Sequence, residues 1–516
     1  MPRDTFEQGD LFEEAPPPPR EFSSPAALLD GFIKKLKKDM LRYAPAAFVP
    51  AGMSVASVAI FTRLFGPEAY GQYSLVIATT SILTMLLAGW MQQSVLRYLP
   101  RYKANRELVR FMERFSAVLA TVCVATLGIL LLSYPFLKNA LADYERFYFP
   151  GVVLVLTGVI FQTLNTVFQA DLKSGRFAKY KIALAAGRLT LALAFVFLVS
   201  RDIIALIIGL AVSELILVVI IKLELGTWQA LKKARRSFDV DFLKKFASYG
   251  FPMIGWMMGG QILEISDRFV IGAYRGATEV GIYSANYSLV SMGIGLLSGP
   301  MLMAAHPLIM SAWEKGNRTL VPGLLSIFSK YYLLVIMPVV FFVAVFSRDF
   351  VDVLLGAEYR DGYTIIPFVL AGYAVWGLSL YGQKGFELLE KTKVMLLLVI
   401  ICALCNIILN LIFVPKFGYF AAAVTTFASY SLYPVLVHRA SRTYLRWRLP
   451  WKSFTRILAA TAVTAVVLVV VRRYVLADLA PLLTILLGGI AGLLAYVIML
   501  LLVKEVKKGK RGHAGS

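Results

Sequence analysis

Charged residues are scarce in this sequence. They make up 16% of its 516 residues, whereas a soluble protein of ordinary composition carries about 25%. Hydrophobic residues make up 58% of the chain, and the mean hydropathy is +0.70. Apolar runs of about 20 residues, long enough to cross the hydrocarbon core as helices, alternate with short basic segments. These features exclude a soluble globular protein and predict an all-α integral membrane protein.

Cysteine and histidine are also rare, with three of each. Cys402 and Cys405 have the CxxC spacing, but no further cysteine or nearby histidine completes a metal site, so we interpret them as packing residues. We expect no cleavable signal peptide, because residues 1–26 are acidic and proline-rich. No GxxxxGK[ST] loop occurs. We therefore expect no cofactor, and a coupling cation (H⁺ or Na⁺) or the membrane potential as the driving force.

Fourteen apolar spans are predicted, with centres near residues 53, 83, 126, 159, 189, 212, 260, 294, 335, 372, 404, 430, 465 and 491. Lysine and arginine collect in every second connection, starting before the first span and ending in the C-terminal tail. Because cytoplasmic loops carry an excess of these residues, we predict a multi-pass protein of the cell (inner) membrane with both termini cytoplasmic. The net charge of +22 is then a property of the loops, and no nucleic-acid partner is expected.

The sequence is predicted to divide into seven segments. They are a disordered cytoplasmic tail (1–26), an interfacial amphipathic helix that contacts anionic membrane lipids (27–43), an N-terminal six-helix bundle (44–223), a cytoplasmic linker (224–245), a C-terminal six-helix bundle (246–445), transmembrane helices 13 and 14 (446–503), and a basic cytoplasmic tail (504–516).

Two stretches of the sequence resemble each other. Thr62–Ser74 reads TRLFGPEAYGQYS and Asp267–Ser284 reads DRFVIGAYRGATEVGIYS. In both, a polar residue and an arginine end one span, a turn with glycine and glutamate follows, and Gly-x-Tyr-Ser opens the next span. Six spans separate the copies, which indicates a parallel repeat. We predict two six-helix bundles around a central cleft, as in an alternating-access transporter, plus two extra C-terminal helices.

These stretches and a third, NIILNLIFVPKFGYFAAAVTTFASY at Asn406–Tyr430, resemble the multidrug/oligosaccharidyl-lipid/polysaccharide exporter superfamily, in its bacterial polysaccharide-flippase branch. The resemblance covers roughly residues 40–445. It implies a transporter, not an enzyme, that moves a polyprenyl-diphosphate-linked oligosaccharide from the inner to the outer leaflet. The product would be a surface polysaccharide such as O-antigen, capsule or exopolysaccharide. We expect a monomer whose partners include polysaccharide polymerase or assembly proteins.

Ionisable residues inside the spans are candidate functional residues, because an isolated charge at the bilayer centre costs about 2.5–3.5 kcal/mol. Arg188 and Glu214 lie at similar depth in consecutive spans. One interpretation is a structural ion pair. The other is that Arg188 faces the cleft and binds the diphosphate, while Glu214 restrains it.

A polar stripe follows one face of the seventh span. Gln261, Glu264 and Arg268 recur at i, i+3 and i+7, and Glu264 and Arg268 have the favourable order for an i, i+4 pair. Asp267 lies on an adjoining face. The stripe is either an intrabundle pair or a cleft lining in which Glu264 and Asp267, with Glu214, take part in coupling or gating.

Further residues are candidates for contacts with the substrate. Arg97 either snorkels to the interface or forms a basic cleft entrance with Gln92, Gln93 and Lys384. Arg63 lies at the other end of the first span. Asn165 either binds sugar hydroxyls or joins two helices.

Two other functions remain open. A cation-coupled multidrug antiporter of the same superfamily is the nearer one, but intramembrane arginines favour an anionic lipid over a cationic drug. A membrane-embedded glycan-modifying enzyme is the lesser one. The longest external loop expected, residues 347–361, is short for an external catalytic site.

Overall fold

The structure is a computed structural model that describes residues 48–226, 238–316 and 318–505, and these residues form helices without strands. The predicted tail 1–26 and interfacial helix 27–43 lie outside the described residues. Part of the linker 224–245 and nearly all of the basic tail 504–516 lie outside them as well.

All fourteen predicted span centres fall within described helices. Eleven of these helices are long and apolar enough to cross a membrane. One of the eleven, Thr392–Ser441, holds two predicted spans, because the backbone turns at Gly418 (φ 64°). The other two predicted spans are the shorter helix Phe48–Leu64 and the helix Val240–Arg275, which carries Glu264, Asp267 and Arg268. The predicted fold of about fourteen transmembrane helices is confirmed.

The first bundle contains helix Phe48–Leu64, α2 (Pro67–Ala104), α3 (Leu108–Leu141), η1 (Ala142–Phe147), α4 (Tyr148–Ala170), α5 (Ser174–Leu198) and α6 (Ile204–Glu224). α2 begins at a proline directly after the extended residue Gly66. Proline is tolerated there because the first helical N–H has no intrahelical partner. Long continuous helices suit a membrane, where the backbone groups must be satisfied within the segment.

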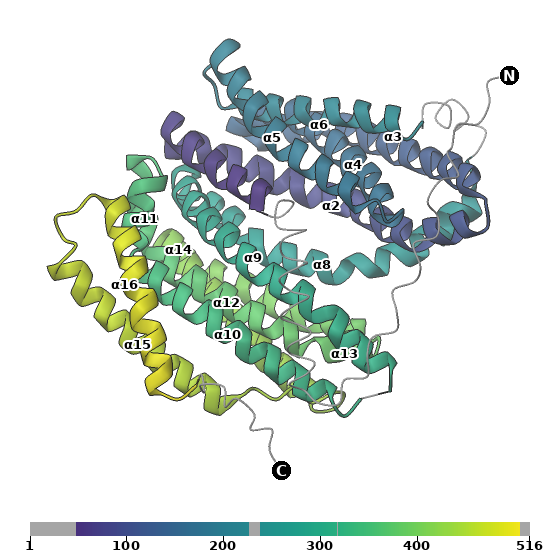
Figure 1. The fold of residues 1–516 in the computed structure, drawn as a ribbon. Helices are drawn as coiled ribbons and strands as arrows, with labels where there is room; N and C mark the ends of the chain where they lie inside the picture. Colours follow the sequence, from purple (N-terminus) through teal and green to yellow (C-terminus); the bar gives the residue numbers. More distant parts are fainter. Residues whose placement is uncertain (1–47, 227–237, 317, 506–516) are drawn as a thin grey trace.

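The second bundle contains α8 (Val240–Arg275), α9 (Ala277–Glu314), α10 (Val321–Val345), α11 (Ser347–Leu354), η2 (Ala357–Ile365), α12 (Ile366–Gly382), α13 (Lys384–Leu388) and α14 (Thr392–Ser441). The turn at Gly418 is held by Glu279, whose carboxylate accepts from the Tyr419 N–H at 3.0 Å and from Arg275 Nε at 2.8 Å. The final helices α15 (Trp451–Tyr474) and α16 (Pro481–Leu502) pack at the edge of this bundle, beside α10 and α11 (Figure 1).

The two ends of the bundles differ in their connections. The basic end carries the α2–α3 and α4–α5 connections and the start of α8, where Arg114 pairs with Asp239 at 3.0 Å. The opposite end carries Gly66, Gly276 and residues 347–365. The basic end is the one that the sequence predicts to be cytoplasmic.

α2 joins the two bundles, because it packs along both α8 and α9 (Figure 1). Near the opposite end, a Cβ atom on Gly71 would lie 1.8 Å from the Ala277 carbonyl oxygen, and one on Gly281 would lie 1.9 Å from that of Pro67. Only glycine permits such an approach. Gly71 and Gly281 open the two Gly-x-Tyr-Ser segments of the repeat, so the repeated segments meet at the boundary between the bundles.

Candidate functional site

A polar cavity of about 840 Å³ lies between the bundles. Its wall comes from helix Phe48–Leu64, α2, α4, α5 and α6 of the first bundle and from α8 and α9 of the second. The charged residues that line it are Lys181, Arg188, Glu214, Glu264 and Arg268. The amides that line it are Gln92, Gln162, Asn165, Gln169 and Gln261. The cavity thus combines a net positive charge with many hydrogen-bonding groups.

Seven of the eleven residues predicted from the sequence line this cavity. They are Gln92, Asn165, Arg188, Glu214, Gln261, Glu264 and Arg268.

Arg188 and Glu214 form an ion pair at the cavity wall. Arg188 Nη2 donates to Glu214 Oε1, and Thr157 Oγ1 donates to Glu214 Oε2 at 2.6 Å. The Glu214 side chain is 2% exposed and that of Arg188 is 41% exposed, so the carboxylate lies behind the guanidinium. The close approach of α5 and α6 depends on Gly209, because a Cβ atom there would lie 2.5 Å from the backbone Cα of Ala192. The pair therefore presents a fixed cation to the cavity.

α8 contributes the second group of charges from the other bundle. Arg268 Nε donates to Ser284 Oγ at 3.2 Å, and the guanidinium carbon lies 5.2 Å from the centre of the Tyr287 ring. Glu264 accepts from the Tyr373 hydroxyl at 2.9 Å. Each charge is thus held by a neighbouring helix of the second bundle. The cavity has an anchored arginine on each side of the bundle boundary.

Lys181 also lines the cavity, although it was not among the predicted site residues. It lies seven residues before Arg188 on α5, so the two side chains share a helix face. This spacing was a signal available in the sequence. Asn165 is 2% exposed, and its side-chain oxygen is buried in the cavity wall without a hydrogen-bond partner among the described residues. That oxygen is available to accept from a ligand.

Asp267 lies outside the cavity lining, in a hydrogen-bond network within the second bundle. It is fully buried, and its carboxylate accepts from Tyr283 Oη and Thr426 Oγ1, both at 2.5 Å, and from Asn410 Nδ2 at 2.6 Å. Asn410 also donates to Asn406 Oδ1 at 3.1 Å. Asn410 and Thr426 belong to the segment Asn406–Tyr430, and their contacts with Asp267 were not predicted.

The Asp267 network has the chemistry to bind a proton or a small hard cation. Its members present carboxylate, amide and hydroxyl oxygens, the ligands that such cations prefer. In the part of the chain that the structure describes, no three His, Cys, Asp or Glu side chains gather in a metal-binding group. A cation here would therefore be held by one carboxylate and neutral oxygens.

Arg63 lies at the opposite end, where it joins the first bundle to the loop before α12. Its guanidinium donates to the carbonyl oxygens of Val353 at 2.6 Å and Leu354 at 3.2 Å. Tyr359 of the same loop donates to the Phe65 carbonyl at 2.7 Å. Arg63 thus contacts backbone across the bundle boundary, and it does not line the cavity in the described structure.

Arg97 and Lys384 also lie away from the cavity lining. The Arg97 guanidinium carbon is 4.4 Å from the centre of the Tyr249 ring, and Lys384 forms an ion pair with Glu387 within the second bundle. Gln92 does line the cavity, where it donates to Gln162 Oε1 at 3.1 Å. Of the four residues predicted to form a basic entrance, Gln92 is the one that lines the described cavity.

Comparisons with known proteins agree with this architecture. Residues 36–313 match the family described as "Polysaccharide biosynthesis protein". An inferred O-antigen transporter of Shigella flexneri is 22% identical over 394 residues, which cover 73% of this chain and 90% of that protein.

Two solved structures share the fold. Lipid II flippase MurJ, in an inward closed conformation, superposes with a TM-score of 0.74 at 16% identity, over 90% of this chain and 99% of its own. An inward-facing multidrug resistance transporter of the MATE family, in the MOP superfamily, superposes with a TM-score of 0.63 at 13% identity, over 77% of this chain and 94% of its own. The transporter fold predicted from the parallel repeat is confirmed.

Proposed function

The chain belongs to the polysaccharide biosynthesis protein family, as its motifs predicted, and from this premise we propose that it is a lipid-linked oligosaccharide flippase. It moves a polyprenyl-diphosphate-linked oligosaccharide from the cytoplasmic to the outer leaflet of the cell membrane, for assembly of O-antigen, capsule or exopolysaccharide. It acts as a transporter and not as an enzyme. Its basic end and both termini face the cytoplasm.

The anchored Arg188 is the observation that carries this proposal. Guanidinium groups bind phosphate oxygens through parallel hydrogen bonds. Arg188 presents its guanidinium to a cavity of about 840 Å³, which has room for a diphosphate and sugar residues. Arg268 offers a second guanidinium from the other bundle. A diphosphate that engages both arginines would bridge the two bundles, so binding would favour their approach.

The amides of the same cavity suit the sugars. Gln92, Gln162 and Asn165 line the wall beside Arg188, and amide groups both donate to and accept from hydroxyls. The polyprenyl tail has no place among these polar groups and remains in the lipid. The cavity therefore separates the head of the substrate from its tail.

Outward release requires the contacts at the opposite end to separate. These contacts include the Arg63 hydrogen bonds to Val353 and Leu354 and the close approach of Gly71 and Gly281. We assign Arg63 to this gate. We expect the bundles to move as rigid bodies around the cavity, because the gate contacts lie at their boundary.

Two driving forces are consistent with the site. A diphosphate carries about two negative charges, and each charge moved outward through an inside-negative potential releases roughly 2.3 kcal/mol per 100 mV. The Asp267 network is the candidate for a coupling H⁺ or Na⁺, because a carboxylate buried among hydroxyl and amide groups changes its hydrogen bonding when it gains or loses a cation. Glu264 lines the cavity and lies three residues before Asp267 on α8, so we assign it to couple this network to the substrate.

A cationic multidrug antiporter is the second candidate, because the fold also superposes on a multidrug transporter. The charges in the cavity favour the flippase. Glu214 is neutralised by Arg188, and three cations line the cavity against two carboxylates. A cationic drug would be repelled by this wall. We further expect a monomer with anionic lipids and polysaccharide-assembly proteins as partners.

The proposal is tested in a strain that lacks this protein. Lipid-linked glycans are extracted, and their sidedness is determined with a membrane-impermeant periodate reagent on intact cells and on inverted vesicles. We expect completed oligosaccharide-diphosphate-lipid to accumulate on the cytoplasmic side and to return to normal when the intact chain is expressed. If the amount and sidedness of the lipid-linked glycan are unchanged and the strain becomes sensitive to cationic drugs, the protein is a multidrug antiporter and the proposal is wrong.

A further inference from the structure

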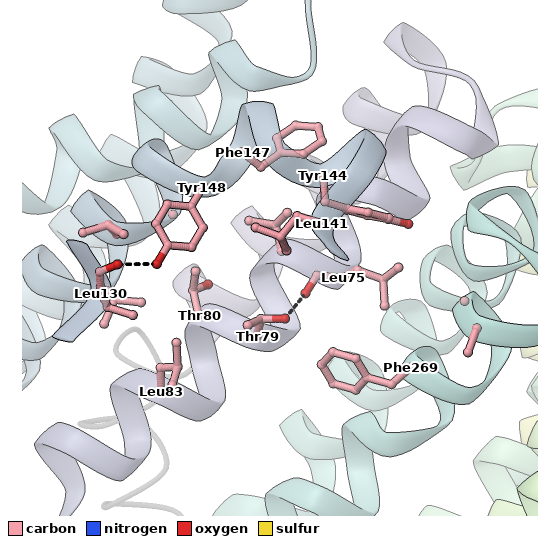
Figure 2. Close-up of a pocket in the computed structure, with 16 residues that line it drawn as sticks. Leu75, Thr79, Thr80, Leu83, Leu130, Leu141, Tyr144, Phe147, Tyr148 and Phe269 are labelled. Atoms are coloured by element: carbon pink, nitrogen blue, oxygen red, sulfur yellow. Dashed lines mark hydrogen bonds between the residues drawn. The ribbon is translucent and has the colours of Figure 1, made fainter. Parts of the chain in front are cut away.

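A second, apolar hollow lies on the other side of α2 from the polar cavity. This lateral groove has a volume of about 380 Å³ and is lined by residues of α2, α3, η1, α4 and α8 (Figure 2). On α2, Leu75, Thr79 and Leu83 face the groove, whereas Tyr73, Ile77 and Ser81 face the cavity. Thr80 lines both spaces, and the other lining residues of α2 lie on different faces of the helix.

The polar atoms of the groove wall are already bonded to backbone. Thr79 Oγ1 donates to the Leu75 carbonyl at 2.8 Å, and Tyr148 Oη donates to that of Leu130 at 2.5 Å (Figure 2). Thr80 Oγ1 donates to the Ile77 carbonyl at 3.1 Å. The remaining wall is mostly aliphatic or aromatic. A hydrocarbon chain suits this wall, whereas a sugar or an ion would find few groups to bind.

The length and depth of the groove match one lipid chain. From Leu75 to Leu83 the groove follows eight residues of α2, about 12 Å at the helical rise. One leaflet contributes about 15 Å, half of the hydrocarbon thickness. The groove starts next to Phe147 of η1, at the opposite end of the bundles, and runs inward from there.

A polar hollow of about 490 Å³ continues the groove toward the opposite end. Three chain segments line both spaces in succession. On α2, Gln72 of the hollow is one turn from Leu75 of the groove; at η1, Arg146 precedes Phe147; and Thr278 follows Ala273 after the α8–α9 turn. The two spaces thus form one site with an apolar and a polar part.

Arg146, its ion-pair partner Asp202 and two further carboxylates determine the charge around the polar hollow. Arg146 donates to Gln72 Oε1 at 2.7 Å and to Asp202 Oδ2 at 3.2 Å, and its side chain is 43% exposed. A guanidinium has five donors, so further ones are available to a phosphate. Glu68 and Glu358 line the same hollow and are exposed. This arrangement complements a head group that carries a phosphate and an ammonium.

We propose that the lateral groove and the polar hollow together bind one zwitterionic phospholipid with a primary ammonium, from the leaflet at the opposite end. One acyl chain fills the groove, Arg146 binds the phosphate, and Glu68 and Glu358 bind the ammonium. Phe269, Gly272 and Ala273 come from the second bundle and the rest of the groove wall from the first. The lipid therefore stabilises the present position of α8 against α2. This site does not depend on the nature of the transported glycan.

The phospholipid is favoured over the polyprenyl tail of a substrate by the position of α2. A substrate whose diphosphate engages Arg188 has its head in the polar cavity, on the other side of this helix. Its tail would have to pass around α2 to enter the groove. A phospholipid enters from the surrounding leaflet directly.

The test is photocrosslinking of the full-length protein in liposomes. The probe is phosphatidylethanolamine with a diazirine on one acyl chain, and phosphatidylglycerol with the same chain is the head-group comparison. Labelled peptides are mapped by mass spectrometry. We expect labelling by phosphatidylethanolamine to be enriched on peptides of the groove relative to the lipid-facing surface of α15 and α16, and less enriched with phosphatidylglycerol.

Two variants make the test specific. Thr79→Trp fills the groove and should abolish the enrichment, whereas Thr190→Trp should leave it unchanged. Thr190 is the matched control, since it is also an exposed helical threonine that donates to the carbonyl four residues earlier. If Thr79→Trp does not fold, Ala273→Leu fills the groove from α8. Arg146→Gln should lower the enrichment for phosphatidylethanolamine.

Three results would overturn the proposal. The first is labelling of the groove no stronger than that of α15 and α16. The second is equal labelling by the two head groups together with no effect of Arg146→Gln. The third is displacement of the phospholipid probe by a polyprenyl phosphate, which would assign the groove to a substrate tail.

Discussion

Arg188→Gln separates a structural role of the ion pair from a role in substrate binding. The substitution leaves the Glu214 carboxylate, which is 2% exposed, with the Thr157 hydroxyl at 2.6 Å as its remaining hydrogen-bond donor among those described. Removing one partner of a buried pair costs about 3–5 kcal/mol. Because Arg188 is 41% exposed to the cavity, we expect a loss near the lower limit, about 3 kcal/mol.

The double variant Arg188→Gln/Glu214→Gln removes the unpaired charge as well. We expect it to recover most of the stability, because two neutral amides remain in contact with each other. It should not recover transport. A hydrogen bond to a charged group contributes about 1.5–3 kcal/mol, so loss of the guanidinium should lower the affinity for the diphosphate by about ten- to a hundredfold.

The assay combines thermal unfolding in detergent with flipping of a lipid-linked oligosaccharide in liposomes. Arg176→Gln is the matched control, because Arg176 and Glu224 form an exposed pair at 3.1 Å on the same two helices, α5 and α6. Exposed ion pairs contribute little to stability, so this variant should change neither the unfolding temperature nor the rate of flipping. Full transport by the stable double variant would refute the assignment of Arg188 to substrate binding.

Three further predictions follow from single contacts. Gly281→Ala places a Cβ atom 1.9 Å from the Pro67 carbonyl oxygen, whereas Gly293→Ala on the same helix meets no atom within 4 Å. Only the first should prevent closure of the opposite end, measured as increased labelling, by an impermeant thiol reagent, of a cysteine introduced into the cavity lining by Ser81→Cys. Asp267→Asn should abolish the dependence of transport on the coupling cation without preventing substrate binding, and unchanged cation dependence would exclude this site. Burial acts to raise the pKa of Asp171, but its ion pairs with Lys103 and Lys173 outweigh burial and hold the pKa below its usual value. This carboxylate therefore stabilises the fold above pH about 4, and its contribution is lost as the pH falls through the lowered pKa. Asp171→Asn should therefore lower the unfolding temperature slightly at pH 7, which corresponds to no more than about 1 kcal/mol in stability. The difference from the intact chain should shrink as the pH falls below about 4.

The order and number of the helices were predictable because the bilayer imposes their length and polarity. An apolar run must span as a helix, so fourteen centres could be placed without knowledge of any contact. The same reasoning predicted that Arg188 and Glu214 lie at one depth, and the two side chains are indeed paired. The repeat predicted the relation of the two bundles.

Contacts around the helix axis could not be predicted in this way. Depth alone placed Arg97 and Lys384 near the basic end, but their partners, Tyr249 and Glu387, are fixed by rotation of the helices and local packing. The partners of Asp267 lie on α14, far away in the sequence. The lateral groove depends on side chains of five elements, and no local pattern indicates it.

The most direct test of the account is transport by the purified protein alone. Polyprenyl-diphosphate-linked oligosaccharide isolated from the deletion strain is placed in the inner leaflet of liposomes with an inside-negative potential, and its appearance outside is followed with an impermeant periodate reagent. We predict that the intact chain exposes the lipid, and that the stable Arg188→Gln/Glu214→Gln variant fails to do so. Equal exposure in protein-free liposomes and in liposomes with the intact chain would contradict the proposed flippase.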